Sequence, residues 1–196
     1  ITDKNGQFIK ELLPVDPKSK VLHGLGQNFY VYDGKLNVFP HFSNTIFSIT
    51  PDSTTQRYHF YFGDYHFPDD EIFQKKEYNS QAIMSEIMNN SYVRLMAPYE
   101  TDEHLLVKYY VKRQVLLGIY NKKKHTAINL DPEMVIDSLH LGTFPVPIGF
   151  NHNEFIGQLT LDIQQKNRIM IPELQKLMAD YSEDSNPILI FYSLRS

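Results

Sequence analysis

A strand-turn-strand pattern that occurs three times constrains this chain more than any other feature. Residues 45–50, TIFSIT, alternate apolar and small polar side chains, as expected for a strand buried on one face. The segments VLLGIYN and PILIFYSL resemble it, and apolar–aromatic pairs align at nearly equal intervals: Ile46-Phe47, Ile119-Tyr120 and Ile190-Phe191. Such self-similarity indicates a fold built from copies of one unit.

Two further strand-like runs precede each aligned strand. Asp33-Gly34, a strong hairpin signal, separates the first such pair of runs. Short polar turns at 101–103 and 152–153 separate the later pairs. Each unit therefore reads as an antiparallel meander, and a four-stranded meander repeated around an axis is a propeller blade. The sequence predicts an all-β fold, a β-propeller of four-stranded antiparallel blades with about three blades present and two short helical insertions.

The helical insertions are predicted from apolar spacing. Ile83, Met84, Ile87 and Met88 recur at helical intervals. A second stretch, around 171–181, has the same periodicity, and Pro172 suits the first turn of a helix. We expect the apolar faces of both helices to pack on the blades.

The unit boundaries follow from the repeat. Residues 1–196 are interpreted as a partial propeller, with these segments: 1–13, the outer strand of a preceding or closing blade; 27–63, a blade; 91–130, a blade; and 146–196, a blade without its outer strand. Three blades cannot close a ring at ordinary blade geometry. The expected explanation is a fragment without its N-terminal blades, and the alternative is a half-propeller that pairs with a second copy.

Composition excludes several classes of protein. The 42% apolar and 21% charged residues predict a folded, soluble core, and a net charge of −4 with dispersed Lys and Arg argues against nucleic-acid binding. No segment approaches the ~20 apolar residues of a membrane span. The chain has no Cys, which excludes disulfides, thiolate metal sites and Cys nucleophiles.

Loop lengths predict where a ligand binds. In a propeller meander, the long connections 64–90, 131–147 and 164–186 fall on one face, and the short turns fall on the other. Long loops in compact domains are usually functional. We therefore expect a ligand on the face with long loops, and the short turns are interpreted as ordinary solvated hairpins.

Five polar residues near that face are the candidate ligand-binding residues: His41, Asn44, His66, Arg113 and His140. His41 and Asn44 share a predicted turn, and Arg113 occupies the corresponding turn of the second unit. An arginine fork there would suit a sugar or a carboxylate. The alternative is ordinary turn chemistry, in which Ser and Asn side chains bond their own backbone.

The richest polar cluster is GDYHFPDDE, with Asp64, His66, Asp69, Asp70 and Glu71. Its residue types suit a hard or borderline metal ion, but its spacing matches no known metal loop. Acidic residues before a helix also stabilise the helix N-terminus, and this interpretation is preferred. We therefore predict no metal, no cofactor and no catalytic residue.

Four segments together resemble a known family: NTIFSITPDSTTQRYHFYFGDYHFP, YETDEHLLVKYY, LLGIYNKKKH and NPILIFYSL. They are similar to the NHL-like six-bladed β-propeller proteins of bacterial cell envelopes, many of unknown function, and would correspond to a C-terminal half. The resemblance implies an exported protein, periplasmic or on the cell surface and often a lipoprotein. The family has no catalytic motif that could be assigned to residues of this chain.

The expected function is a non-catalytic binding or scaffold propeller whose ligand lies at the channel mouth. A glycan, a peptide or a protein partner would suit such a site. The alternative is a propeller-type hydrolase or lyase with residues from several blades at the axis. Because fold alone does not decide between binding and catalysis, the question of an enzyme stays open here.

Overall fold

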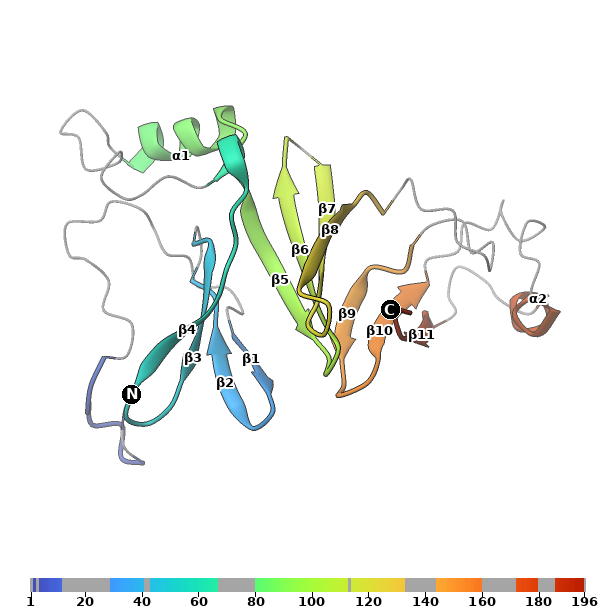
Figure 1. Cartoon of the computed structure of the whole chain (residues 1–196), viewed down its shortest axis with the longest axis horizontal. Coiled ribbons are helices and arrows are strands. Elements are labelled where there is room, and N and C mark those ends of the chain that lie inside the picture. Colours follow the sequence, from blue (N-terminus) through green and yellow to red (C-terminus); the bar gives the residue numbers. More distant parts are fainter. Residues whose placement is uncertain are drawn as a thin grey trace. The chain divides into compact units, whose positions relative to one another are not determined.

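A computed structural model describes most of the chain (Figure 1). The described residues are 2, 4–11, 29–40, 43–66, 80–112, 114–132, 144–159, 172–179 and 186–195. The chain divides into two compact units. The first comprises Ile1–Ala97 and Tyr109–Gln114, and the second comprises Pro98–Lys108 and Val115–Ser196.

The first sheet is a four-stranded antiparallel meander in the order β1-β2-β3-β4. Its strands are β1 (Phe29–Tyr32), β2 (Lys35–Val38), β3 (Thr45–Ile49) and β4 (Thr54–His59). Asp33 and Gly34 join the first two strands with φ values of 50° and 66°. Positive φ at both central positions is typical of the two-residue turn whose twist matches that of the strands it joins. This dipeptide therefore sets the register of the hairpin.

The second sheet is a longer meander in the order β5-β6-β7-β8. Its strands are β5 (Arg94–Glu100), β6 (His104–Val111), β7 (Gln114–Asn121) and β8 (Thr126–Leu130). The third sheet has three strands in the order β11-β10-β9: β9 (Pro147–Phe150), β10 (Phe155–Leu159) and β11 (Ile188–Tyr192).

Three helical segments accompany the strands. They are a 3-10 turn, η1 (Gly63–Tyr65), and two α-helices, α1 (Ser80–Asn89) and α2 (Pro172–Ala179). Neither α-helix, nor any other helix within the described ranges, is long and apolar enough to cross a membrane.

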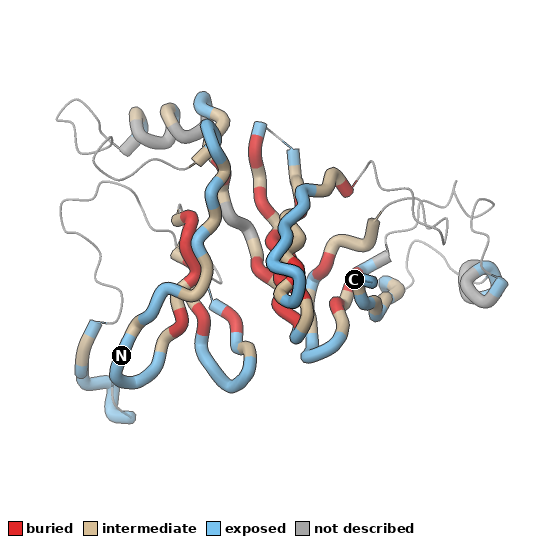
Figure 2. The backbone as a smooth tube through the Cα atoms, viewed as in Figure 1, coloured by how far each residue is buried: buried red, intermediate tan, exposed pale blue. Residues whose placement is uncertain are grey.

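The core of the second unit joins two of its sheets. Leu106 on β6, Leu117 on β7 and Phe155 on β10 form a fully buried cluster, against which Tyr192 packs. Figure 2 shows buried residues gathered along β5 to β7. This cluster anchors the hairpin turns at the ends of these strands, where the candidate site lies.

The predicted β-propeller is wrong. The described strands form three separate antiparallel sheets of four, four and three strands, and these residues make no closed ring. Alternating side chains and hairpin turns specify pairing between strands that are neighbours in the chain. Every meander shares that property, and it does not determine how one sheet joins the next. The predicted boundaries of the repeat units are a separate question, which the strand order does not test, and they stay a prediction.

The resemblance to NHL-like six-bladed propellers is overturned for the same reason. The quoted motifs were short aromatic-rich strands with their turns, and such segments occur in many antiparallel sheets. The blades and the channel mouth that this resemblance implied are therefore wrong as well.

Candidate functional site

Three hairpin turns of the second unit are bound to one another through their backbones. Asp102, in the β5–β6 turn, donates its N–H to the carbonyl of His152 in the β9–β10 turn at 2.8 Å. Lys122, in the β7–β8 turn, donates its N–H to the carbonyl of Glu103, also at 2.8 Å. Because backbone groups make these bonds, they link the three turns to one another directly.

Asparagine side chains shape two of these turns. The Oδ1 of Asn121 accepts the backbone N–H groups of Lys123 and Lys124 at 3.0 and 2.9 Å. The Oδ1 of Asn151 accepts those of Asn153 and Glu154 at 2.9 and 2.8 Å. Asparagine suits such turns because its carbonyl mimics a backbone acceptor.

A buried ion pair fastens the β7–β8 turn to β5. The Nζ of Lys122 lies 2.7 Å from the Oε1 of Glu100, whose side chain is fully buried. The same Nζ donates to the carbonyl of Thr101 at 2.6 Å. A buried carboxylate requires such a partner, so this ion pair helps to hold the β7–β8 turn in place.

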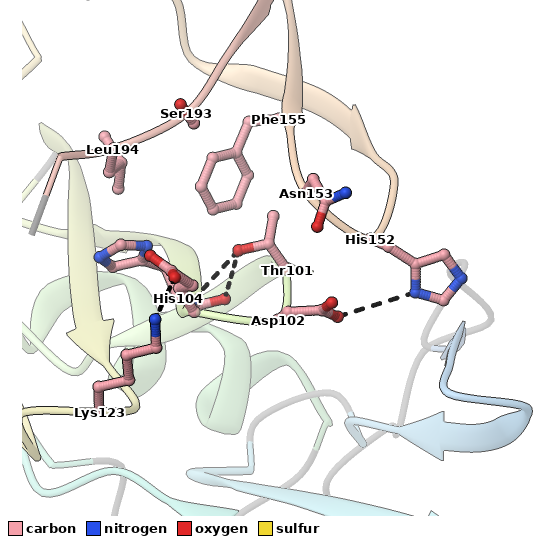
Figure 3. Close-up of a pocket in the computed structure, with 10 residues that line it drawn as sticks. Thr101, Asp102, His104, Lys123, His152, Asn153, Phe155, Ser193 and Leu194 are labelled. Atoms are coloured by element: carbon pink, nitrogen blue, oxygen red, sulfur yellow. Dashed lines mark hydrogen bonds and ion pairs between the residues drawn. The ribbon is translucent and has the colours of Figure 1, made fainter.

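The three turns surround a polar cavity of about 450 Å³ (Figure 3). Phe155 and Leu194 supply its apolar surface. The other lining residues are polar: Thr101, Asp102, Glu103, His104, Lys123, His152, Asn153 and Ser193. A cavity of a few hundred Å³ with convergent polar groups is the usual form of a small-ligand site.

Two acid–base pairs lie among these lining residues. Lys123 forms an ion pair and a hydrogen bond with the carboxylate of Glu103. That contact holds the pKa of Glu103 below its usual value, so its carboxylate stays ionised at neutral pH. The Nδ1 of His152 lies 3.8 Å from the Oδ1 of Asp102, which is longer than a hydrogen bond (Figure 3).

His104 is the most buried ionisable group of the lining, with 5% of its surface exposed. The Nδ2 of Asn121 lies 3.1 Å from its Nε2. Since two backbone N–H groups occupy the Oδ1 of Asn121, the amide must present Nδ2, which only donates. The Nε2 of His104 is therefore an acceptor, and the ring proton is on Nδ1.

Burial lowers the pKa of His104, so the ring is neutral near pH 7. None of the described protein groups accepts a hydrogen bond from Nδ1, and this nitrogen is not among the fully enclosed polar atoms. His104 lines the cavity, so its ring is a candidate hydrogen-bonding group for a ligand.

The structure places two of the five sequence-predicted site residues together, in the first unit. The Nδ2 of Asn44 lies 3.0 Å from the Nε2 of His66. The His66 ring lies 5.6 Å from the ring of His59 and 5.7 Å from that of Tyr61, between centroids. Tyr61 is 83% exposed, so this group is an aromatic surface cluster.

The remaining predicted site residues, His41, Arg113 and His140, lie outside the described residues, as do Asp69, Asp70 and Glu71 of the predicted polar cluster. Among the residues that are described, no group of three or more His, Asp or Glu side chains could hold a metal ion.

Sequence reasoning missed the cavity because its residues occupy short turns. Such turns were assigned to the face without long loops, and the basic run at 122–124 was interpreted as solvated. One available signal was the recurrence of charged or histidine residues at successive turns, as at Asp102 and His152.

Together these features define an all-β protein of antiparallel meanders with a polar cavity at its hairpin turns. The family model described as "Domain of unknown function (DUF4934)" matches residues 1–193. The chain belongs to this family. A comparison with curated proteins finds no match.

One solved structure shares the fold. It is a crystal structure of a Bacteroides fragilis protein described as a "Putative exported protein", with a TM-score of 0.79 and 19% sequence identity. The match covers 99% of this chain and 57% of that protein, so the chain spans a little over half of its length. At this identity the likeness concerns the fold alone.

Proposed function

We propose that this chain is a non-catalytic binding domain of an exported protein, and that the cavity at the hairpin turns of the second unit binds the end of a glycan. His104, a neutral and almost fully buried ring that lines the cavity, carries this proposal. The Nδ1–H of this ring has no acceptor among the described protein groups, so a ligand or a water that reaches it gains a hydrogen bond.

The lining offers both halves of the hydrogen bonding that sugar hydroxyls require. Hydroxyl groups donate and accept, so a polyol is satisfied only where acceptors and donors lie close together. The carboxylates of Asp102 and Glu103 accept, whereas Lys123 and His104 donate. Phe155 and Leu194 supply apolar surface for the carbon–hydrogen face of a sugar ring.

Binding is favoured over catalysis by how the ionisable groups are engaged. A general acid or base works best with a pKa near the operating pH. Here the contact with Lys123 lowers the pKa of Glu103, and burial lowers the pKa of His104. Both shifts move the pKa values of these two groups further below neutral pH. Their protonation states are therefore constant near pH 7, as a surface that only forms hydrogen bonds requires.

Export is part of the proposal and is supported by the shared fold with the Bacteroides protein described as exported. Secretion of the full-length protein can be measured by cell fractionation with an epitope tag. Recovery in the cytoplasmic fraction alone would contradict this part of the proposal and leave the binding part unaffected.

The binding proposal is tested by titrating ¹⁵N-labelled protein with glucose, galactose and N-acetylglucosamine. We expect saturable shifts of the backbone amides at 101–104 and 152–153. His104→Phe keeps a planar ring but removes the donor, and should weaken binding at least tenfold. His59→Phe, the same exchange in the first unit, should leave the affinity unchanged.

Two results would overturn the proposal. One is the absence of saturable shifts with every saccharide, and the other is equal affinity in the wild type and in His104→Phe. A folded His104→Phe protein, judged by its amide dispersion, is required for either comparison. Shifts confined to 58–66 would instead assign binding to the aromatic cluster around Tyr61.

A further inference from the structure

Asn121, at the end of β7, connects two parts of the cavity wall through one side-chain amide. Its Oδ1 accepts the backbone N–H groups of Lys123 and Lys124 at 3.0 and 2.9 Å. Its Nδ2 lies 3.1 Å from the Nε2 of His104 on β6 and donates to it. Asn121 is buried, so bulk water does not readily replace either contact.

These contacts are compatible only while the Nε2 of His104 is an acceptor. An imidazolium ring carries a proton on both nitrogens, so protonation would set an Nε2–H against the Nδ2 of Asn121, which also donates. Rotation of the amide by half a turn would present Oδ1 to the ring. It would also turn Nδ2 toward the N–H groups of Lys123 and Lys124, which would lose their acceptor.

From this arrangement we infer that Asn121 is a positioning residue of the cavity, which couples the protonation of His104 to the conformation of the β7–β8 turn. The inference rests on the proposed function, since it assigns a regulation to the same binding site. Neutral His104 keeps the turn bound to Asn121, and protonated His104 releases it. Lys123 lines the cavity and pairs with Glu103, so release of the turn changes the lining and weakens ligand binding.

The surroundings of His104 decide when the turn is released. Burial is the largest influence, and it lowers the pKa of His104 below its ordinary value. The neighbouring Glu103 favours the protonated ring, whereas Lys122 and Lys123 in the β7–β8 turn oppose it. The other titratable groups of the lining are Asp102 and His152. The turn therefore stays bound to Asn121 at neutral pH and is released only in acid.

An NMR titration without ligand tests the coupling. The pH of ¹⁵N-labelled protein is lowered from neutral until the ring of His104 is protonated, as its ring ¹⁵N resonances report. We expect the backbone amides of Lys123 and Lys124 to shift with the same midpoint as this ring. His104→Gln keeps an acceptor for Asn121 but does not titrate, so this midpoint should vanish. His125→Gln removes the exposed histidine of the turn itself and should keep the response.

Asn121→Asp separates a positioning role from a merely structural one. A carboxylate has two acceptor oxygens, so one can accept from the turn while the other accepts from the Nε2–H of His104. The ring should then titrate at a higher pH, and its neutral form should carry the proton on Nε2, which the ring ¹⁵N shifts distinguish. The amides of Lys123 and Lys124 should no longer follow the ring. A merely structural role for Asn121 would leave the tautomer unchanged.

The effect on binding is measured with glucose, galactose and N-acetylglucosamine, above and below the midpoint of His104 in each protein. We expect the affinity of the wild type to fall about three- to tenfold below the midpoint, as the loss of one hydrogen bond implies. In Asn121→Asp the affinity should stay within about twofold across its own midpoint, because the turn keeps its acceptor.

The outcomes separate this inference from the proposed function. Amides of Lys123 and Lys124 that ignore the protonation of His104 would overturn the inference, as would unfolding of the wild type before that ring titrates. A turn that responds while saccharide affinity stays constant would overturn the regulation and leave the proposed function intact. If no saccharide bound at any pH, the proposed function and its regulation would be wrong, while the titration without ligand would still decide the coupling.

Discussion

The Nζ of Lys122 lies 2.7 Å from the Oε1 of Glu100, and the Glu100 side chain is fully buried. This contact joins the β7–β8 turn to the end of β5, directly behind the cavity lining. A buried carboxylate that loses a countercharge in direct contact with it retains its desolvation cost without the compensating attraction. The position of the turn therefore depends on Lys122 more than on the exposed lysines that follow it.

Lys122→Met should destabilise the protein by about 3–5 kcal/mol, as is usual when one partner of a buried pair is removed. Urea denaturation measures the change. Lys124→Met, in the same turn but exposed, is the control and should stay within about 0.5 kcal/mol. Equal effects of the two substitutions would show that the ion pair does not hold the turn. Adding Glu100→Gln to Lys122→Met should recover part of the loss.

Gly157 on β10 cannot carry a side chain in this structure. A Cβ there would lie 2.8 Å from the Cβ of Pro145 and 3.2 Å from the Cε1 of Tyr192. Gly157→Ala should cost about 1–3 kcal/mol through overpacking. Gly149→Ala is the matched control on neighbouring β9, because the nearest atom to its Cβ would be 3.7 Å away. In thermal unfolding, Gly157→Ala should therefore have a clearly lower midpoint temperature than Gly149→Ala.

Tyr192 packs its ring on Phe155 and donates its hydroxyl hydrogen to the carbonyl of Pro145 at 2.6 Å. Burial raises the pKa of Tyr192 well above its ordinary value. Tyr192→Phe keeps the ring and should cost about 0.5–1.5 kcal/mol in chemical denaturation. Titration with base, followed by ultraviolet absorbance, should show one fewer tyrosine that ionises at unusually high pH in the variant. An unchanged titration curve would contradict this assignment.

Local strand pairing was readable from the sequence, whereas the assembly of the sheets was not. Asp33-Gly34 predicted a two-residue hairpin, and the structure has positive φ at both positions, with Tyr32 opposite Lys35. The turn chemistry there is local, so the Asp33-Gly34 dipeptide and the strands beside it contain the necessary information. The propeller was inferred from similarity among such units, and contacts between sheets depend on long-range packing that no local pattern encodes.

The candidate site shows the same difference between local features, which could be predicted from the sequence, and long-range contacts, which could not. Asn44 and His66 were both predicted, and their side chains meet, because one lies just before β3 and the other just after η1. The cavity was missed because its residues come from three turns that lie far apart in the sequence. Long-range contacts, such as the backbone bond from Asp102 to His152 and the ion pair between Lys122 and Glu100, bring them together.

The contact between Asn44 and His66 should contribute to stability. Asn44→Ala removes the hydrogen bond at 3.0 Å to the His66 ring, and should cost about 0.5–1.5 kcal/mol. Asn129→Ala, at an exposed position on β8, is the matched control and should be nearly neutral. Chemical denaturation with a far-UV signal measures both. Equal stability of the two variants would contradict a structural role for the contact.

His104 should make stability depend on pH in a defined window. Burial lowers its folded-state pKa below 6.5, so the unfolded chain binds the proton more readily. The stabilisation is complete above about pH 6.5 and is lost as pH falls from there toward the folded-state value. Glu103, whose folded-state pKa is also lowered, acts only below about 4.5, whereas the effect of His104 begins near 6.5.

His104→Gln should therefore flatten the fall in unfolding free energy that begins as pH drops below about 6.5, while Glu103→Gln should leave the start of that fall unchanged. Urea denaturation at closely spaced pH values measures both profiles, and an NMR titration of the His104 ring reports its pKa directly. A ring that titrates at or above 6.5 would contradict the lowering of its pKa by burial. Asn121→Asp should raise the pKa of His104, because it places a carboxylate beside Nε2.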